Sequence, residues 1–309
     1  MIGANTFAID RLVPDVERIW IPEHIHDFEG FVRFQLLDHA TAPAIRRTSR
    51  KLRLRNKLRP PAAIDMGERI FFDTRYDDYF NWSHQANFYM SLALAARKWL
   101  GKDITIVLPT AMPAITVDLY RLFNFDTIAT DGPVTGRQCK WEVSHWETVN
   151  CGRKILVPDD QDFPTCDTPK KLFISRRDYR TISNEAEVEA ALPGFTKVYT
   201  EDLSAAEQFA LFQNATHVVA VHGAGLAPMQ YRPRSAPPLR LVEIAPAGMV
   251  TRWFAIMCDQ IGGRYIQVRG RFKPEYIHDL YGSEPYVKYT NDSFEVDPKS
   301  LKIALEMIE

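Results

Sequence analysis

The clearest pattern of hydrophobic and polar positions lies in the second half of the chain, where short apolar runs alternate with segments of helical periodicity. The apolar runs are rich in β-branched residues, which is typical of buried strands. Between them, apolar residues recur three and four positions apart, which predicts helices. This alternation indicates βαβ units and a parallel sheet covered on both faces. We expect strands at 171–175, 195–200, 217–221, 239–244 and 264–268, and helices at 184–192, 203–215 and 250–262.

The first half of the chain is less regular. Residues 1 to about 70 are rich in aromatic residues, proline and arginine, without a repeat, and we expect irregular structure there. Between residues 71 and 160, segments with helical spacing of apolar residues alternate with short β-branched runs. We expect helices at 86–100 and 113–123, and strands at 103–109 and 153–158.

A domain boundary is expected near residue 160, where "DDQDFPTCDTPKK" combines two prolines with few apolar residues. The chain would then consist of an N-terminal domain, 1–160, and a C-terminal domain, 165–296. A C-terminal helix at 297–309 is expected to pack back on the N-terminal domain.

The composition is that of a globular protein large enough for two domains: the 309 residues are 46% hydrophobic and 25% charged, with a formal net charge of -1. No basic excess points to nucleic acid. No apolar stretch approaches the ~18 residues of a membrane helix, and the N-terminus has no signal-peptide pattern, so we expect a cytoplasmic protein. Cys139, Cys151, Cys166 and Cys258 are too scattered for a zinc, redox or disulfide motif.

A loop of small residues follows the predicted strand 217–221. The stretch "AVHGAGLAPM" places His222, Gly223, Ala224 and Gly225 directly after the last valine of that strand. Ligands of parallel sheets bind beyond the C-terminal strand ends, and glycine lets main-chain N–H groups approach an anion or a ribose. A strand-to-helix turn that needs glycine only for packing is the alternative.

Three arginines follow strand 171–175, at the same edge of the predicted sheet. The stretch "ISRRDYR" places Arg176, Arg177 and Arg180 just after Ser175. Guanidinium groups match phosphate oxygens bidentately, and a diphosphate carries enough charge for more than one of them. A solvated basic loop is the alternative. Two anion-compatible features at one sheet edge together favour a nucleotide-diphosphate site.

These segments carry a family resemblance. The stretches "LFISRRDYRTISNEAEVEAAL", "LSAAEQFALFQNATHVVAVHGAGLAPMQY" and "LVEI" resemble, in order and spacing, the C-terminal block of glycosyltransferase family 61: S-R-x-x-x-R-x-x-x-N-E, then L-S-x-x-E-Q, then H-G-A-G-L. The resemblance covers roughly residues 170–245. Upstream, "DDYFNWSHQ" (77–85) is similar to the N-Y-x-H-W segment of the family, with Asn81 in place of its histidine.

The resemblance implies a GT-B architecture, in which two Rossmann-like domains with parallel sheets face a cleft. The N-terminal domain would bind the acceptor and the C-terminal one the nucleotide sugar, expected to be UDP-linked. It also implies an inverting single displacement without an obligatory metal and without a cofactor. The diphosphate would lie against the arginines, and the loop would close over it by main-chain contacts. The donor-binding residues thus implied are Ser175, Arg176, Arg177, Arg180, His222, Gly223, Ala224, Gly225 and Leu226.

Three neighbouring polar residues have two interpretations each. Glu207 either completes a capping box with Ser204 or contacts the ribose. Asn184 either begins its helix or touches the ligand. Glu243, at the binding edge of the predicted sheet, is a candidate acceptor for a ribose or sugar hydroxyl, and we count all three as donor-binding candidates.

An inverting displacement needs a base for the proton of the acceptor hydroxyl. With Asn81 unable to serve, His84 is the first candidate and Asp78 the second. A metal-dependent GT-A-type alternative would use Asp160 and Asp162, since two carboxylates one residue apart can share a hard cation; we expect no metal site.

The segment "RRTSRKLRLRNKLR" (46–59) is basic throughout and contains three leucines. Anionic lipid attracts such segments by ~1 kcal/mol per basic residue, which predicts peripheral contact with the inner face of a cell membrane; a solvated segment or one that holds an anionic acceptor is the alternative.

The function expected is that of a bacterial, hexosyl- or pentosyl-type inverting glycosyltransferase acting on a cell-surface polysaccharide or a lipid-linked oligosaccharide. A catalytically silent sugar-nucleotide-binding subunit of a polysaccharide assembly complex is one rival. A nicotinamide or flavin oxidoreductase is another, against which no G-x-G-x-x-G follows an early strand.

Overall fold

The computed structural model divides the chain into two compact units. One is continuous, residues 24–161, and is called here the N-terminal unit; the other combines residues 1–23 with 162–309 and is called the C-terminal unit. Of the residues that the structure describes, no helix is both long and apolar enough to cross a membrane. The described residues are 8–11, 32–45, 54, 57–58, 60–75, 80–143, 167–233, 235–247, 249, 253–271 and 289–309.

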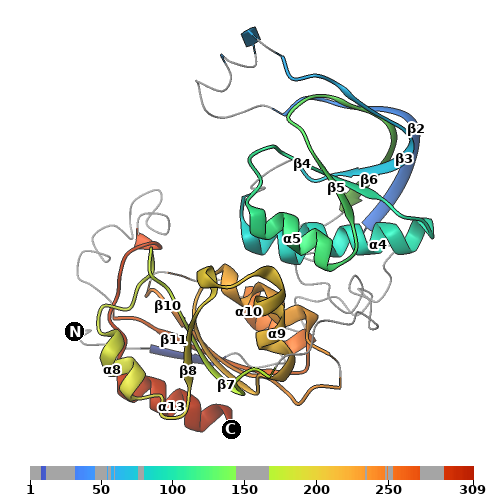
Figure 1. Ribbon diagram of the computed structural model, residues 1–309. Helices are drawn as coiled ribbons and strands as arrows, with labels where there is room; N and C mark the ends of the chain where they lie inside the picture. Colours follow the sequence, from blue (N-terminus) through green and yellow to red (C-terminus); the bar gives the residue numbers. More distant parts are fainter. Residues whose placement is uncertain are drawn as a thin grey trace. The chain divides into compact units, whose positions relative to one another are not determined.

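The C-terminal unit contains β7, β8, β10 and β11, which are labelled in Figure 1. It is built on a six-stranded sheet in the order β1-β11-β10-β9-β7-β8. Strands β7 to β11 are mutually parallel, and β1 adds an antiparallel edge against β11. The five parallel strands coincide with the five predicted ones to within a residue or two. The strands are β1 (Ala8–Arg11), β7 (Lys171–Ser175), β8 (Thr196–Tyr199), β9 (His217–Val221), β10 (Arg240–Ala245) and β11 (Arg264–Arg269).

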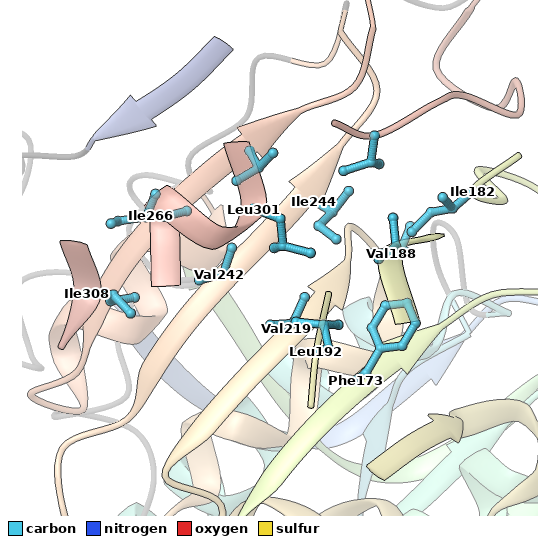
Figure 2. Packing of buried hydrophobic residues seen from close by; sticks show 14 of the residues in the cluster. Phe173, Ile182, Val188, Leu192, Val219, Val242, Ile244, Ile266, Leu301 and Ile308 are labelled. Carbon is cyan, nitrogen blue, oxygen red and sulfur yellow. The ribbon is translucent and has the colours of Figure 1, made fainter. Parts of the chain in front are cut away.

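Helices cover both faces of this sheet, because alternate side chains of its strands point to opposite sides. On one face α8 and α13 pack against Val219, Val242 and Ile266 (Figure 2). On the other face α9, α10 and η4 pack against Val218 and Leu241. The helices are α8 (Glu185–Ala190), α9 (Ala205–Asn214), α10 (Trp253–Gln260) and α13 (Pro298–Ile308), with 3-10 helices η3 (Thr200–Asp202) and η4 (Ala224–Tyr231).

The last helix, α13, belongs to the core of the C-terminal unit, whereas residues 297–309 were expected to pack against the N-terminal domain. Asp297 caps it by accepting a hydrogen bond from the main-chain N–H of Lys299 (3.0 Å). Leu301, Ala304 and Ile308 recur at helical spacing and are buried in the same cluster as β10 and β11. This apolar stripe explains the docking.

The N-terminal unit contains a second α/β sheet, in the order β2-β6-β3-β4-β5. Strands β3 to β6 are parallel and β2 is antiparallel to β6. Two largely parallel sheets confirm the expected α/β, GT-B-like class. The expected strand 153–158 lies outside the described residues. The elements are β2 (Val32–Ala42), β3 (Ile64–Asp73), β4 (Thr105–Leu108), β5 (Asp126–Ala129), β6 (Val134–Val143), α4 (Met90–Leu100), α5 (Ala114–Leu122) and the π-helix η2 (His84–Tyr89).

Candidate functional site

The two predicted anion-compatible segments meet where the strand order of the C-terminal sheet reverses. β7 pairs directly with β9, although β8 lies between them in the sequence, with Lys171 opposite His217 and Ile174 opposite Ala220. In open α/β sheets the crevice for ligands lies at such a switch point, outside the carboxyl ends of the strands. The arginine segment after β7 and the glycine loop after β9 therefore leave the sheet side by side.

Arg176 joins the two segments. Its Nη1 donates a hydrogen bond to the main-chain oxygen of His222 (3.1 Å), and its guanidinium group lies over the ring of Tyr179, 4.1 Å from the centroid. The side chain is only partly buried. A cation is thus held, with part of its surface open, beside the loop that precedes η4.

The other two arginines have additional partners. Arg180, in a left-handed backbone conformation (φ 58°), donates from Nε to the main-chain oxygen of Thr290 (2.8 Å) and from Nη2 to Oδ1 of Asn291 (3.2 Å). Arg177 donates from Nη1 to Oδ1 of Asp202 (2.6 Å), in a solvent-exposed ion pair. An incoming phosphate would compete with those contacts, so Arg176 is the arginine best placed to receive one.

The two glycines of the loop lie against protein atoms. A Cβ atom at Gly223 would lie 1.9 Å from Nη1 of Arg176, and one at Gly225 would lie 2.7 Å from Oγ1 of Thr200. The loop leads into η4 at Ala224, and the first N–H groups of a helix have no partner within it. The side chain of Leu226, whose main chain was predicted to contact the donor, is buried in the apolar core, 1% exposed.

His222 is held by a buried carboxylate. Its Nδ1 hydrogen-bonds to Oε1 of Glu243, and the other carboxylate oxygen accepts from the hydroxyl of Tyr265 and from Nε2 of Gln267 (3.2 Å). Burial, with Glu243 beside it, raises the pKa of Tyr265 well above its usual value, so the phenol keeps its proton and donates. Glu243 is 0% exposed. The predicted contact with a sugar hydroxyl does not fit this arrangement, because three protein donors surround the carboxylate.

Ser175 belongs to a second polar network. Its hydroxyl donates to Oε1 of Glu185, the first residue of α8, whose Oε2 accepts from Nζ of Lys197 (2.9 Å) and the hydroxyl of Tyr199 (3.2 Å). Burial alone would raise the pKa of Glu185, but the hydrogen bonds from Lys197 and Ser175 outweigh it, and the pKa is lowered. Ser175 is buried and ties β7 to α8.

Asn184 and Glu207 both have local structural partners. Asn184 pairs with the main chain of Val296, accepting from its N–H (3.0 Å) and donating to its oxygen (2.8 Å). Glu207 and Ser204 form the complete capping box of α9, and the hydrogen bonds from Ser204 lower the pKa of Glu207. The contacts of Glu207 are those of the capping interpretation. Asn184 lies at the N-cap position of α8, but its side chain makes no capping hydrogen bond and instead ties that position to Val296.

In the N-terminal unit, His84 begins the π-helix η2 and is partly exposed. Oδ1 of Asn81 accepts from the main-chain N–H groups of Ser83 (3.0 Å) and His84 (3.4 Å). Asn81, which stands where the family pattern has a histidine, thus binds the main chain at the start of η2, the helix that carries the candidate base His84. Asp78, Asp160 and Asp162 lie outside the described residues, as does most of segment 46–59.

The reversal of strand order in the N-terminal sheet, between β3 and β6, is filled by protein. Arg75 forms a bidentate ion pair with Asp73 and donates to the main-chain oxygens of Gly132 (2.6 Å) and Pro43 (3.1 Å). Both charged side chains are almost completely buried. A phosphate here would have to break a buried ion pair, which makes the C-terminal unit the better donor site.

A polar hollow of about 760 Å³ lies beside the first residues of β3 and β6. It is lined by Asp38, Asp65, Glu68 and Arg137, among others, and Arg137 is already paired with Asp38 (3.0 Å). Within the described part of the chain, no three His, Cys, Asp or Glu side chains gather as metal ligands would.

Comparison with known proteins identifies a family for this chain. The sequence profile of "Glycosyltransferase 61" matches residues 47–237, which is more than half of the chain and includes both β7 with its arginines and β9 with its loop. No curated protein matches the sequence. The chain therefore belongs to glycosyltransferase family 61, and that membership implies transfer of a sugar from a donor to an acceptor.

Proposed function

We propose that this protein takes its sugar from a nucleotide-sugar donor, UDP-linked, whose diphosphate binds over the C-terminal ends of β7 and β9. The contact between Arg176 and the main chain of His222 carries the proposal. It brings a partly exposed cation and the N-terminus of η4 to one point of the sheet, and both attract phosphate. Family membership supports sugar transfer as the reaction, and this geometry supports a binding site for the diphosphate of the donor.

In this proposal Arg176 supplies the charge-assisted hydrogen bond to the leaving diphosphate, while Arg177 and Arg180 contribute once their present partners are displaced or shared. The acceptor hydroxyl attacks the anomeric carbon on the face opposite the diphosphate. The new glycosidic bond forms as the bond to the phosphate oxygen breaks, which inverts the anomeric centre, and the nucleoside diphosphate leaves with the electron pair. Preorganised positive groups around a departing anion are the main service such a site provides.

A base must take the proton of the acceptor hydroxyl. We keep His84 as the first candidate and Asp78 as the second. The arginines and main-chain dipoles would supply the positive field that a metal supplies elsewhere, so activity should survive EDTA. We further propose a cell-surface polysaccharide or lipid-linked oligosaccharide as acceptor. Segment 46–59 would then contact anionic lipid from the cytoplasmic side, which the exposed Leu54 and Leu58 support (59% and 74% exposed).

The test is calorimetric titration with UDP, followed by nucleotide release from UDP-, GDP- and CMP-sugars with and without acceptor. Arg176→Ala should weaken UDP binding by about 1.5–3 kcal/mol, the value of a hydrogen bond to a charged group, with an unchanged melting temperature. Arg121→Ala, at an exposed arginine paired with Asp118 in the other unit, is the matched control and should bind UDP normally. Equal UDP affinity in all three proteins would refute the diphosphate site.

The same assay separates an enzyme from a silent binding subunit. His84→Ala should lower turnover by ~10²–10⁴-fold with UDP affinity unchanged, because a general base acts on the acceptor and not on the nucleotide. A chain that binds UDP but releases no nucleotide from any donor would instead be the silent subunit.

A further inference from the structure

Tyr179 lies beside both of the arginines that belong to the family pattern. That pattern, S-R-x-x-x-R, contains Arg176 and Arg180 and leaves position 179 open. Cζ of Arg176 lies 4.1 Å from the centroid of the Tyr179 ring, and Cζ of Arg180 lies 5.5 Å from it. An aromatic face attracts cations within about 6 Å of its centroid. One tyrosine ring is therefore within range of both cations.

The two guanidinium groups also share an anchor on the neighbouring loop. Nη1 of Arg176 and Nη1 of Arg180 both reach the main-chain oxygen of His222 (3.1 and 3.5 Å). Two like charges held this close repel each other. The face of the aromatic ring and the carbonyl oxygen are both electron-rich, so they offset part of that repulsion. An anion that bound both groups would relieve the rest.

The two arginines account for the position of the Tyr179 side chain better than packing does. The side chain is 45% exposed, and its hydroxyl makes no hydrogen bond among the described residues. The main chain that follows it is fixed, because the N–H of Arg180 donates to the oxygen of Asn291 (3.0 Å). The ring thus stands on an anchored segment of main chain, and the contacts that the structure gives it are those with the two guanidinium groups.

Holding an arginine in place before the ligand arrives strengthens binding. A free arginine side chain loses rotamer freedom when it binds an anion, and that loss opposes binding. A guanidinium group stacked on an aromatic face has already lost part of this freedom. We infer that Tyr179 is a positioning residue, which holds Arg176 and Arg180 together as a clamp for the diphosphate of the donor. This inference rests on the proposed function. Tyr179 acts through the arginines and does not touch the nucleotide.

The experiment is a calorimetric titration with UDP, or with GDP if the wild type binds that nucleotide instead. Tyr179→Phe keeps the aromatic ring, whereas Tyr179→Leu removes it. Each protein is compared with the wild type, and Tyr179→Leu is also made in the Arg176→Ala background. Trp99→Leu is the matched control, because it removes an aromatic side chain of similar exposure (50%) in the other unit. Circular dichroism and melting curves establish that each variant folds.

We expect Tyr179→Leu to weaken nucleotide binding by about threefold to thirtyfold, the factor that corresponds to one cation–π contact. Tyr179→Phe and Trp99→Leu should bind the nucleotide as the wild type does. In the Arg176→Ala background Tyr179→Leu should cause a smaller loss, because one of the two cations that the ring holds is already absent.

Three results would overturn the inference and leave the diphosphate site standing. Equal losses from Tyr179→Leu in the two backgrounds would mean that the ring touches the nucleotide itself. A loss in Tyr179→Phe as large as that in Tyr179→Leu would assign the effect to the hydroxyl. Wild-type affinity in Tyr179→Leu, with weakened binding in Arg176→Ala, would show that the arginine needs no ring beside it. Absence of UDP and GDP binding by the wild type would overturn the donor site and the inference with it.

Discussion

Gly223 lies against the guanidinium group of Arg176 closely enough to leave no room for a side chain. Its backbone is extended (φ 164°), a conformation that any residue adopts, so space and not backbone geometry demands glycine here. The neighbour is the end of a flexible side chain, which can move. A methyl group at position 223 would therefore displace Arg176 rather than unfold the loop.

A double-mutant cycle tests this relation. Gly223→Ala should weaken UDP binding nearly as much as Arg176→Ala, and the double variant should bind no worse than Arg176→Ala alone, a coupling of about 1–3 kcal/mol between the two sites. Calorimetry gives the affinities, and thermal unfolding should shift little. Gly225→Ala, whose methyl group would meet Thr200 instead, should be additive with Arg176→Ala. If Gly223→Ala weakens binding equally in the Arg176→Ala background, the glycine makes room for the donor itself.

The meeting of the arginines with the glycine loop could be predicted from the sequence, because both follow strands of one parallel sheet. Tyr265 and Gln267 could not be found in the same way. Their signal is alternation, since residues two apart on β11 share the face that carries Glu243. To use this alternation, a reader of the sequence must know that Gln267 lies opposite Glu243 in the sheet. The register of β10 against β11 follows from packing and not from local sequence.

At the scale of elements, α8 is tied to the sheet by charge as well as by apolar packing. Lys197 on β8 bridges Glu185 and Glu189 of α8 (2.9 and 3.0 Å). The pKa of Glu185 is lowered in the folded protein, where burial opposes the shift and the hydrogen bonds from Lys197 and Ser175 prevail. The unfolded chain thus binds this proton more tightly than the folded one does.

The sign of the pH dependence follows from that difference. The stabilisation is fully present above the unfolded pKa of Glu185, about 4.3, and is lost as the pH falls through the lower folded pKa. Lys197→Met should reduce the free energy of unfolding at neutral pH and make its decline below about pH 5 shallower. Urea unfolding of the C-terminal unit at several pH values measures both. Lys302→Met, at an exposed position on α13, should reproduce the wild-type profile; a Lys197→Met profile parallel to the wild type would contradict the linkage.

Strand prediction succeeded for β4 and for the five parallel strands of the C-terminal unit, but it missed β1, β2, β3, β5 and β6. Interrupted ladders account for part of what was missed. Residues 1–70 were expected to be irregular, yet they contain β2 and most of β3. The pairing of β2 with β6 shifts register between Leu37 and Ala40, and that of β3 with β6 shifts between Asp65 and Ile70. A bulge breaks the alternation of apolar and polar side chains on which a sequence reader relies, so these strands leave no clean pattern.

At the scale of the molecule, the core of the C-terminal unit is completed by α13, the last helix of the chain. Leu301 is 0% exposed and Ile303, on the same helix, is 48% exposed. Leu301→Ala should lower the free energy of unfolding by about 2–5 kcal/mol through the cavity it leaves, whereas Ile303→Ala should stay within about 0.5 kcal/mol of the wild type. Hydrogen exchange followed by peptide should confine the loss of protection to the C-terminal unit, including residues 167–271 and 289–309. Equal effects of the two variants, or a loss spread over both units, would contradict the placement of α13.

The antiparallel pairing of β1 with β11 bears on the order in which the protein can assemble during synthesis. Residues 8–11 leave the ribosome early, but their partner strand, 264–269, is made more than two hundred residues later. The continuous unit, 24–161, can fold in that interval, since domains generally fold as units and in the order of their synthesis. Until β11 has been synthesised, the β1 segment lacks the strand with which it pairs. We therefore expect nucleotide binding to be among the last properties acquired by the growing chain.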